Sequence, residues 1–600
     1  MMTSKRGVRA AAKNAAAKLR QNEVSDEDGS QPRGSAVSNV ESDPSDIDLR
    51  PAKRRRTTPH PKSKSSLNNE THQIFQASFS LPSSDTTHPA TCVFPSRSHP
   101  VTYHRPLLLY SPSSRQSLLT WFDKVHSARN MPWRKPWINP SEYASRPSDL
   151  HAALSQRAYE VWISEIMLQQ TRVAVVTSYW TRWMARWPTI SDLAAAKQDE
   201  VLAMWQGLGY YSRARRIHEA AALVCADPEM RGLLPKDVGE LQKRVPGVGR
   251  YTAGAIAAIV FGLPEALVDG NVLRVLSRQL GVLGDVKGDR RVVEVLWEAA
   301  GELVKAVARD GDGEDVSDRP GKWGQALMEL GSTVCTPRPN CGKCPVTETC
   351  RAYAEGLALA KGHRTQALQD VEDICGLCAP FDEAEEGAEA RTKTNSKRGA
   401  LSFFFTPTQT TKTRITGTAT AATPDDRTLE AIISHAKKFP LKIPKKKVRE
   451  EETLVCAIRR VSDNQYLIYR RPDKGLLAGM WEFPSHILPE SNDSTAKDRK
   501  NKAMSYVSHL VEETKAKGAK NLRKPTLRHT EEIGSVPWQF SHLRLTMHVH
   551  LFELDDVDGS SEVVVKLEAR QRWATGEDID MESMGTGMKK CWSLVKERVR

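Results

Sequence analysis

The sequence lacks the features that mark membrane proteins and disulfide-stapled proteins. No apolar run reaches the about 18 residues that a membrane span requires, and no secretory signal is visible. Cysteine is sparse, with 10 residues in a chain of 600, which argues against a disulfide framework. We therefore expect no membrane partner. The length suits two or three domains.

Acidic residues are outnumbered as well. The 87 Lys and Arg residues exceed the 73 Asp and Glu residues and give a formal net charge of +14. An excess of this sign favours an acidic polymer as partner. A solvated basic tail would supply much of the same excess without binding anything.

Composition divides the chain into four parts. Residues 1–100 are polar and rich in Ser and Pro, which predicts a disordered tail with targeting signals. Residues 101–354 follow a helical rhythm and predict an all-α domain. Residues 355–452 have the biased composition of a connector. Residues 453–600 carry strand-like runs and predict a small α+β domain.

Several elements can be placed more closely. Tyr159–Met167 has the spacing of an amphipathic helix, and Tyr251–Phe261 is apolar nearly all round, as in a buried helix. Leu454–Val461 and Tyr466–Arg470 predict a β-hairpin, and Leu543–Phe552 alternates like a strand. The last helix is expected within Met588–Arg600.

The tail offers two localisation signals. Lys53–Arg56 is a basic run typical of nuclear localisation, with a solvated basic tail as the alternative. Residues 1–20 contain Lys, Arg and many Ala but no acid, as in a mitochondrial transit peptide. The expected location is the nucleus, with the mitochondrion as a second location.

A turn between two apolar helical runs carries the first chemical signal. In Val245–Gly249 a Gly-x-Gly turn exposes backbone N–H groups at a helix N-terminus, where a phosphate oxygen can bind. Helices also meet at Pro-Gly turns that bind nothing. Asp269 follows about one helix length later, and its simplest role is an N-cap.

A second carboxyl lies far upstream. Glu165 stands beside the apolar stripe of its helix, where partial burial would raise its pKa, although a solvent-facing glutamate is the simpler interpretation. Asp269, at a helix N-terminus, would stay ionised. One neutral and one charged carboxyl is the arrangement that cleaves glycosidic bonds.

Four of the cysteines are crowded together. Cys335, Cys341, Cys344 and Cys350 have the spacing of metal ligands. This spacing leaves three interpretations open: a metal cofactor, a structural zinc site, or thiols that bind no metal.

Longer motifs join these signals. Val161–Thr171, Gly207–Arg213, the hairpin turn and Val268–Asn271 resemble the adenine DNA glycosylases of the MutY type, in the helix-hairpin-helix superfamily. The resemblance extends from Trp121 to Tyr353 and resumes in the C-terminal domain. It implies a monomeric, monofunctional glycosylase that removes adenine mispaired with 8-oxoguanine or guanine in double-stranded DNA, during base excision repair.

The resemblance also implies residue roles. Glu165 would protonate adenine at N7, Asp269 would stabilise the cationic sugar, and Tyr251 and Asn271 would orient them. The pocket around a flipped-out adenine would include Arg129, Met131, Trp133 and Gln325, of which Trp133 also suits core packing. The duplex would be wedged by Gln170, Thr171, Leu208 and Tyr210, and the phosphate gripped at Gly247 and Gly249.

Tyr251 separates this family from its relatives. Endonuclease III-like enzymes place a Schiff-base lysine at this position, and tyrosine cannot form the imine that strand cleavage requires. The alternatives are a bifunctional glycosylase/AP lyase, which Tyr251 argues against, and a non-catalytic damage-sensing scaffold, which Glu165 and Asp269 argue against.

The resemblance implies two cofactors. Cys335, Cys341, Cys344 and Cys350 would hold a 4Fe-4S cluster, although five residues separate the first two cysteines where the family usually has six. His104, Cys375 and Cys378 match three ligands of a zinc site, and the fourth has no clear counterpart.

The C-terminal domain resembles Nudix domains through Gly475–Pro484. Ser508-His509 replaces the Arg-Glu pair that holds magnesium, so pyrophosphatase activity is not expected. Phe540, Ser541 and His542 match the loop that reads 8-oxoguanine. Leu401–Phe405 resembles a sliding-clamp-binding motif with Arg398 at the usual glutamine position, and the alternative is an apolar patch that folds onto either domain.

Overall fold

The computed structural model describes most of the chain outside its N-terminal tail and connector. The described residues are 32–33, 92, 94, 97–311, 316–362, 375–379, 425–444, 448–472, 477–488, 495–513, 526–540, 543–555 and 570–599. Contacts divide the chain into two compact units, one of Glu41–Thr181 and Pro228–Lys445, the other of Met1–Val40, Arg182–Asp227 and Lys446–Arg600. Within the described residues, no helix is long and apolar enough to cross a membrane.

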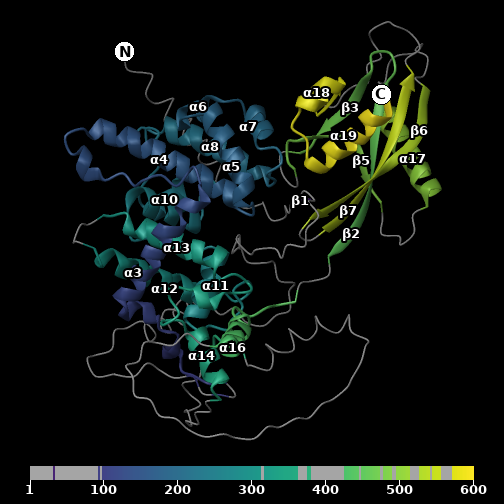
Figure 1. The fold of residues 1–600 in the computed structure, drawn as a ribbon. Coiled ribbons are helices and arrows are strands. Elements are labelled where there is room, and N and C mark those ends of the chain that lie inside the picture. Colours follow the sequence, from purple (N-terminus) through teal and green to yellow (C-terminus); the bar gives the residue numbers. More distant parts are fainter. Residues whose placement is uncertain are drawn as a thin grey trace, which may run out of the picture. The chain divides into compact units, whose positions relative to one another are not determined.

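The unit of Glu41–Thr181 and Pro228–Lys445 is helical (Figure 1). Its helices are α3 (Pro112–Val125), α4 (Pro147–Leu168), most of α5 (Val173–Arg186), α9 (Val238–Arg244), α10 (Arg250–Phe261), α11 (Gly270–Gln279), α12 (Arg290–Arg309), α13 (Arg319–Thr333), α14 (Arg351–Ala360) and α16 (Asp426–Ala436). Short 3₁₀ turns join some of them, among them η3 (Ser127–Arg129).

The core of this unit lies around α11, α12 and α13. Val272, Leu276, Leu296 and Leu330 are fully buried there. Helix α10 is buried from Thr252 to Val260, which confirms the apolar helix predicted from the sequence. Close helix packing sets the geometry of the site: a Cβ at Gly331 of α13 would lie 2.8 Å from Cβ of Asn271.

Helices α14 and α16 pack against each other although 65 residues separate their ends (Figure 1). Gly356 permits the contact, because a Cβ there would lie 2.8 Å from Cα of Ile432. The buried carboxylate of Glu355 joins the two helices, since it accepts a hydrogen bond from His435 Nε2 at 2.7 Å when that nitrogen carries the proton.

The other unit combines helices from 182–227 and from the C-terminal part of the chain with a mixed sheet. The helices from 182–227 are α6 (Ile190–Ala195), α7 (Gln198–Met204) and α8 (Tyr211–Ala226). The strands are β1 (Pro32–Arg33), β2 (Arg449–Arg460), β3 (Gln465–Arg470), β4 (Trp481–Glu482), β5 (Ser485–Ile487), β6 (Thr526–Phe540), β7 (Leu543–Asp555) and β8 (Gln571–Ala574). The main order is β1-β6-β7-β2-β3-β4, with β5 beside β2 and β8 beside β3.

Two helices cover opposite faces of this sheet. Alternate residues of β2 point to opposite sides, so Val455 and Ala457 join the core beneath α19 (Thr586–Val599). Leu454 and Cys456 join the core beneath α17 (Ala496–Glu513). A short α18 (Gly576–Met581) precedes α19. The predicted hairpin and the alternating strand are confirmed as β2–β3 and β7. The last helix begins two residues earlier than predicted.

Candidate active site and cysteine sites

Glu165 lies in the last turn of α4 and is 6 % exposed. Its Oε2 accepts a hydrogen bond of 2.7 Å from the hydroxyl of Tyr251, in the first turn of α10. Burial raises the pKa of Glu165 to about 7, and the charge of Asp269 adds to the increase. The Tyr251 hydrogen bond and the charges of Arg134 and Arg157 act in the opposite direction. The predicted increase in pKa by burial is therefore present.

Asp269 caps the N-terminus of α11, as its position in the sequence suggested. Oδ1 accepts the backbone N–H of Val272 at 2.7 Å, and Oδ2 accepts Asn271 Nδ2–H at 2.9 Å. Both carboxylate oxygens are therefore oriented by donors from the first turn of the same helix.

Arg274 connects this aspartate to the cysteine loop, and the sequence did not single it out. Its Nη2 donates to Asn271 Oδ1 at 2.7 Å and to the carbonyl of Gly331 at 2.8 Å. Its Nε donates to the carbonyl of Cys335 at 3.0 Å. The signal that would have found it is its spacing, one helical turn after Asn271.

The residues predicted to form the adenine pocket lie on two segments. Arg129, Met131 and Trp133 belong to the segment 129–133, and Gln325 belongs to α13. Met131 and Trp133 are buried, and Trp133 packs edge-on against Trp180 with ring centroids 6.1 Å apart. Arg129 donates to Glu329 Oε1 at 2.7 Å. Gln325, one turn before Glu329 on α13, donates to the carbonyl of Gly321 at 3.1 Å. Glu329 is a buried residue that the sequence did not indicate.

The helix-hairpin-helix turn joins α9 to α10. Gly247 has a φ of 81°, in the left-handed region that favours glycine. Gly249 is the N-cap of α10 and contributes no side-chain cap, so the first backbone N–H groups of α10 receive no hydrogen bond from its cap residue. This arrangement suits a phosphate oxygen.

The predicted wedge residues fall in both units. Gln170, with a φ of 52°, is exposed directly after α4, and Thr171 Oγ1 donates to the carbonyl of Gln169. In the other unit Leu208 is buried, and Tyr210, with a φ of 48°, precedes α8 and lies against the Arg213 guanidinium. The role of these residues in wedging the duplex stays a prediction.

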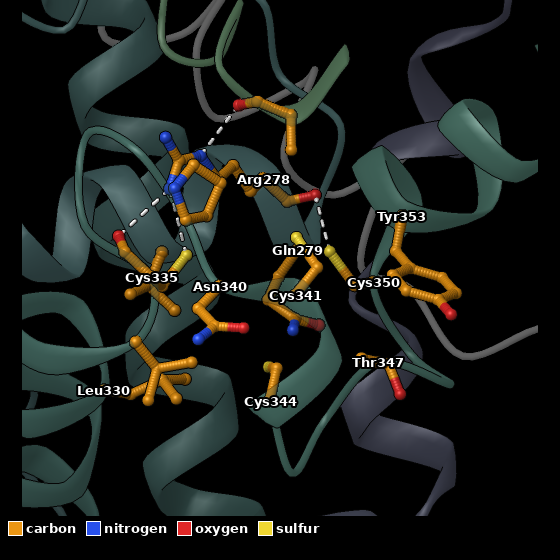
Figure 2. Close-up of a pocket in the computed structure, with 14 residues that line it drawn as sticks. Arg278, Gln279, Leu330, Cys335, Asn340, Cys341, Cys344, Thr347, Cys350 and Tyr353 are labelled. Atoms are coloured by element: carbon orange, nitrogen blue, oxygen red, sulfur yellow. Dashed lines mark hydrogen bonds between the residues drawn. The ribbon is translucent and has the colours of Figure 1, made fainter. Parts of the chain in front are cut away.

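Cys335, Cys341, Cys344 and Cys350 line one cavity (Figure 2). Arg278, which is 2 % exposed, places Nη1 3.3 Å from Cys335 Sγ and donates to the carbonyl of Thr336 at 2.7 Å. Burial raises the pKa of the other three thiols, Cys341, Cys344 and Cys350. The shortened spacing between the first two cysteines therefore does not prevent the four from facing one cavity.

The second cysteine site has four ligand atoms. Among the described residues, His99, His104, Cys375 and Cys378 form a group whose ligand atoms lie within 4.8 Å of one another. His104 Nε2 lies 3.1 Å from Cys375 Sγ and 3.5 Å from Cys378 Sγ. His104 and the two cysteines thus meet as the sequence suggested. His99 is the fourth residue that the sequence did not provide.

The two histidines are oriented by the backbone. Nδ1 of His99 lies 2.8 Å from the carbonyl of Arg97, and Nδ1 of His104 lies 2.9 Å from that of Leu280. A proton on each Nδ1 leaves both Nε2 lone pairs directed at the group, as in metal-binding histidines. The sequence did contain a signal for His99: it lies five residues before His104, and two such histidines together with a Cys-x-x-Cys pair make a full set of four zinc ligands.

Several sequence predictions concern residues with little structural description. Phe540 is buried at the end of β6, whereas Ser541 and His542 lie outside the described residues. The clamp-like segment Leu401–Phe405 and the basic run Lys53–Arg56 also lie outside them.

The helical fold, the hairpin and the paired carboxyls define the class, a helix-hairpin-helix DNA glycosylase with an appended Nudix-like domain. Residues 163–301 match the HhH-GPD superfamily of base excision DNA repair proteins, and residues 454–594 match the NUDIX domain.

The full-length relatives are more specific. The chain is 36% identical to the adenine DNA glycosylase of Homo sapiens over 485 residues, covering 80% of this chain and 73% of the relative. It is 32% identical to the adenine DNA glycosylase of Schizosaccharomyces pombe over 460 residues, covering 75% of this chain and 84% of the relative.

A solved complex of the mouse MUTYH C-terminal domain with human PCNA aligns at 27% identity and a TM-score of 0.18, over 25% of this chain and 90% of that chain. The chain belongs to the adenine DNA glycosylase family, the MutY homologues.

Proposed function

We propose that this enzyme excises adenine mispaired with 8-oxoguanine in duplex DNA by hydrolysing the N-glycosidic bond. The observation that carries the proposal is the buried carboxyl of Glu165, whose pKa of about 7 keeps much of it protonated near neutral pH. A neutral carboxyl facing a flipped base can act as a general acid.

The roles follow from the donors around each carboxyl. Glu165 gives its proton to adenine N7, so the electrons of the breaking C–N bond leave with a neutral base. Asp269, held by Val272 N–H and Asn271, faces the cationic sugar and stabilises it, with a transient covalent bond as the limiting form. Water then attacks the sugar and gives its proton to the Glu165 carboxylate, which completes the hydrolysis and restores the acid.

The test is the variant Glu165→Gln, which keeps the shape of the side chain but cannot supply the proton. We expect base release from an A:8-oxoguanine duplex to be abolished under single-turnover conditions, while mismatch binding is largely retained. Glu302→Gln, on the surface of α12, is the control. Full activity of Glu165→Gln would overturn the assignment.

Excision without strand cleavage is part of the same proposal. The lysine of the lyase enzymes is replaced by Tyr251, whose hydroxyl is bonded to Glu165. Borohydride treatment with an abasic duplex should therefore trap no covalent complex. Trapping would favour the bifunctional glycosylase/lyase instead.

Recognition of 8-oxoguanine is assigned to the C-terminal domain through Phe540, Ser541 and His542. Phe540 is buried at the end of β6, and Ser541 and His542 follow it directly in the sequence. Changing His542 to Ala should reduce the preference for A:8-oxoguanine over A:G while the A:G excision rate is maintained. An equal loss on both duplexes would place these residues outside the recognition step.

We infer a 4Fe-4S cluster at Cys335, Cys341, Cys344 and Cys350. Their sulfurs surround a cavity rather than forming the tight group seen at the other site, and a cubane cluster needs wider sulfur spacing than one zinc ion. The cluster would give this loop a structural centre. Iron and acid-labile sulfide analysis should return about four of each per chain.

We infer a zinc ion at His99, His104, Cys375 and Cys378. Two imidazoles and two thiols are a donor set that zinc prefers, and four ligands complete its tetrahedral shell. Metal analysis should give one zinc per chain, and His99→Ala should lose it while the iron content is unchanged.

Clamp binding and nuclear localisation remain proposals from the sequence. The aromatic side chains of Leu401–Phe405 are the feature that supports a docking peptide. Changing Phe403 and Phe404 to Ala should abolish capture by a purified sliding clamp, and unchanged capture would exclude this segment.

A further inference from the structure

Glu329 is a buried carboxylate between two arginines. It lies on α13 and is 2 % exposed. Oε1 accepts from Arg129 Nη1 at 2.7 Å, and Oε2 accepts from Arg134 Nη2 at 2.8 Å. Each carboxylate oxygen is thus committed to a different guanidinium, and both arginines come from the segment that carries Met131 and Trp133.

The same part of α13 also reaches the acid. Met328, the neighbour of Glu329, places its sulfur 3.1 Å from the hydroxyl of Tyr251, which donates to Glu165. Glu329 therefore ties the segment that carries Arg129 and Arg134 to helix α13, which contacts Tyr251 through Met328.

Four charged or titratable groups act on Glu165 from the elements packed around it. Tyr251 comes from α10, Asp269 from the start of α11, Arg157 from α4, and Arg134 from the loop after η3. The two arginines favour the ionised carboxylate and so oppose the protonated form needed for catalysis.

The positive charges of Arg157 and Arg134 are paired with different groups. Arg157 donates to the carbonyl of Trp133 at 2.7 Å and lies 3.9 Å from Glu160. Arg134 lies 2.8 Å from Glu329 and over the ring of Phe122, and its Nη1 is buried with no hydrogen-bond partner among the described residues. Glu329 is the carboxylate that the described structure pairs with both Arg129 and Arg134.

We propose that Glu329 is a positioning residue of adenine excision, which holds Arg129 and Arg134 in the pocket wall and neutralises the positive field that reaches Glu165. The proposal rests on the proposed function, because it concerns the proton that Glu165 supplies. Glu329 does not contact the base in this scheme. It acts through the two guanidinium groups.

The test is the pH dependence of single-turnover excision by Glu329→Gln. In the wild type the rate falls as pH rises through the pKa of Glu165. With Arg134 uncompensated, Glu165 should ionise at lower pH, so the falling limb should shift toward acid. A midpoint lower by about one pH unit reduces the protonated fraction about tenfold at pH values above both midpoints. The rate near pH 5 should fall much less than the rate near pH 8.

A double variant separates electrostatics from packing. Glu329→Gln combined with Arg134→Met removes the uncompensated charge, and the midpoint should return toward the wild-type value even if the rate stays low. Glu329→Asp, which keeps the charge, should also retain the wild-type midpoint. A rate loss of equal size at every pH would assign Glu329 a packing role and overturn the proposal.

The outcomes for the two proposals are distinguishable. Wild-type protein that releases no adenine contradicts the proposed function itself. Wild-type activity together with an unshifted midpoint in Glu329→Gln contradicts only the role of Glu329. If Glu329→Gln does not fold, Arg134→Met alone decides, because removing this charge should shift the midpoint toward alkali, and an unchanged midpoint overturns the proposal.

Discussion

At the scale of single residues, two opposing effects set the pKa of Glu165: burial raises it, and the hydrogen bond from Tyr251 lowers it. Tyr251 donates to Oε2, and this bond stabilises the ionised form and lowers the pKa of Glu165. Tyr251→Phe should therefore raise that pKa. The falling limb of the excision profile should move to higher pH, opposite to the shift expected for Glu329→Gln. A limb that moves toward acid would show that the hydroxyl stabilises the protonated form instead.

The residues that the sequence revealed are those whose environment is local. Glu165 is flanked by the apolar positions of its own helix, and Asp269 caps the helix that follows it, so a single segment predicts each environment. Glu329 and His99, which were not predicted from the sequence, depend on distant partners: Glu329 binds Arg129, 200 residues away, and His99 joins Cys375 and Cys378. Their partners are set by the packing of α13 and of the connector, which no local pattern contains.

At the scale of elements, the hairpin offers a matched pair of glycines. Gly247 has a φ of 81°, so Gly247→Ala should destabilise the fold by about 1 kcal/mol. Gly249 has an ordinary φ of −90° and no heavy atom within 4 Å of an added Cβ. Gly249→Ala should therefore leave the thermal midpoint nearly unchanged.

The two variants should differ in DNA binding as well. A methyl group at Gly249 occupies the space where a phosphate would approach the N-terminus of α10, so Gly249→Ala should weaken duplex binding. Fluorescence anisotropy at several salt concentrations measures this loss. Equal affinity for wild type and Gly249→Ala would mean that the phosphate does not approach at this glycine.

A buried ion cluster joins α14 and α16 to the N-terminal segment. Glu355 accepts from Arg97, Tyr103 and His435. Burial alone would raise its pKa, but hydrogen bonds from His435 and Arg97 and the charge of Arg97 lower it to about 2, from an ordinary value of 4.5. Because the folded-state pKa is lower than the unfolded one, this stabilisation is present above about pH 4.5 and lost as pH falls toward 2.

Glu355→Gln tests this cluster. It leaves the Arg97 guanidinium buried without a carboxylate and should reduce the free energy of unfolding at pH 7 by about 3 kcal/mol. Urea unfolding at pH 7 and pH 4 should show that the difference between variant and wild type shrinks in acid. A constant difference would indicate that packing, rather than the ion pairs, carries the effect.

The predictions of strands and their pairing succeeded where the paired residues are close together in the sequence. The turn Ser462–Asn464 and its flanking apolar runs predict the β2–β3 hairpin, because both strands adjoin the turn. The parallel pairing of β2 with β7, from Arg449↔Leu543 to Arg460↔Leu554, joins strands about 80 residues apart. Alternation in Leu543–Phe552 indicates a strand but cannot select its neighbour.

At the scale of the whole molecule, the His/Cys site closes the chain on itself. His99 and His104 precede α3, whereas Cys375 and Cys378 follow α14, so a bound ion would tie together segments separated by nearly the whole helical unit. An ion that binds the folded but not the unfolded chain stabilises folding by mass action, by about 2.7 kcal/mol at a free concentration one hundred times its Kd. Chelation should therefore lower the thermal midpoint.

The control must separate this site from the cysteine loop. Cys375→Ser should melt at the chelated wild-type temperature and show no further response to chelator or added zinc, while its iron content and visible absorption remain those of the wild type. Arg274 links the loop at Cys335 to Asn271, whereas no hydrogen bond in the described residues joins His99 to the two carboxyls. Excision by folded Cys375→Ser at low temperature should thus stay near the wild-type rate. A large loss there, with iron retained, would show that the histidine–cysteine site contributes to catalysis as well as to stability.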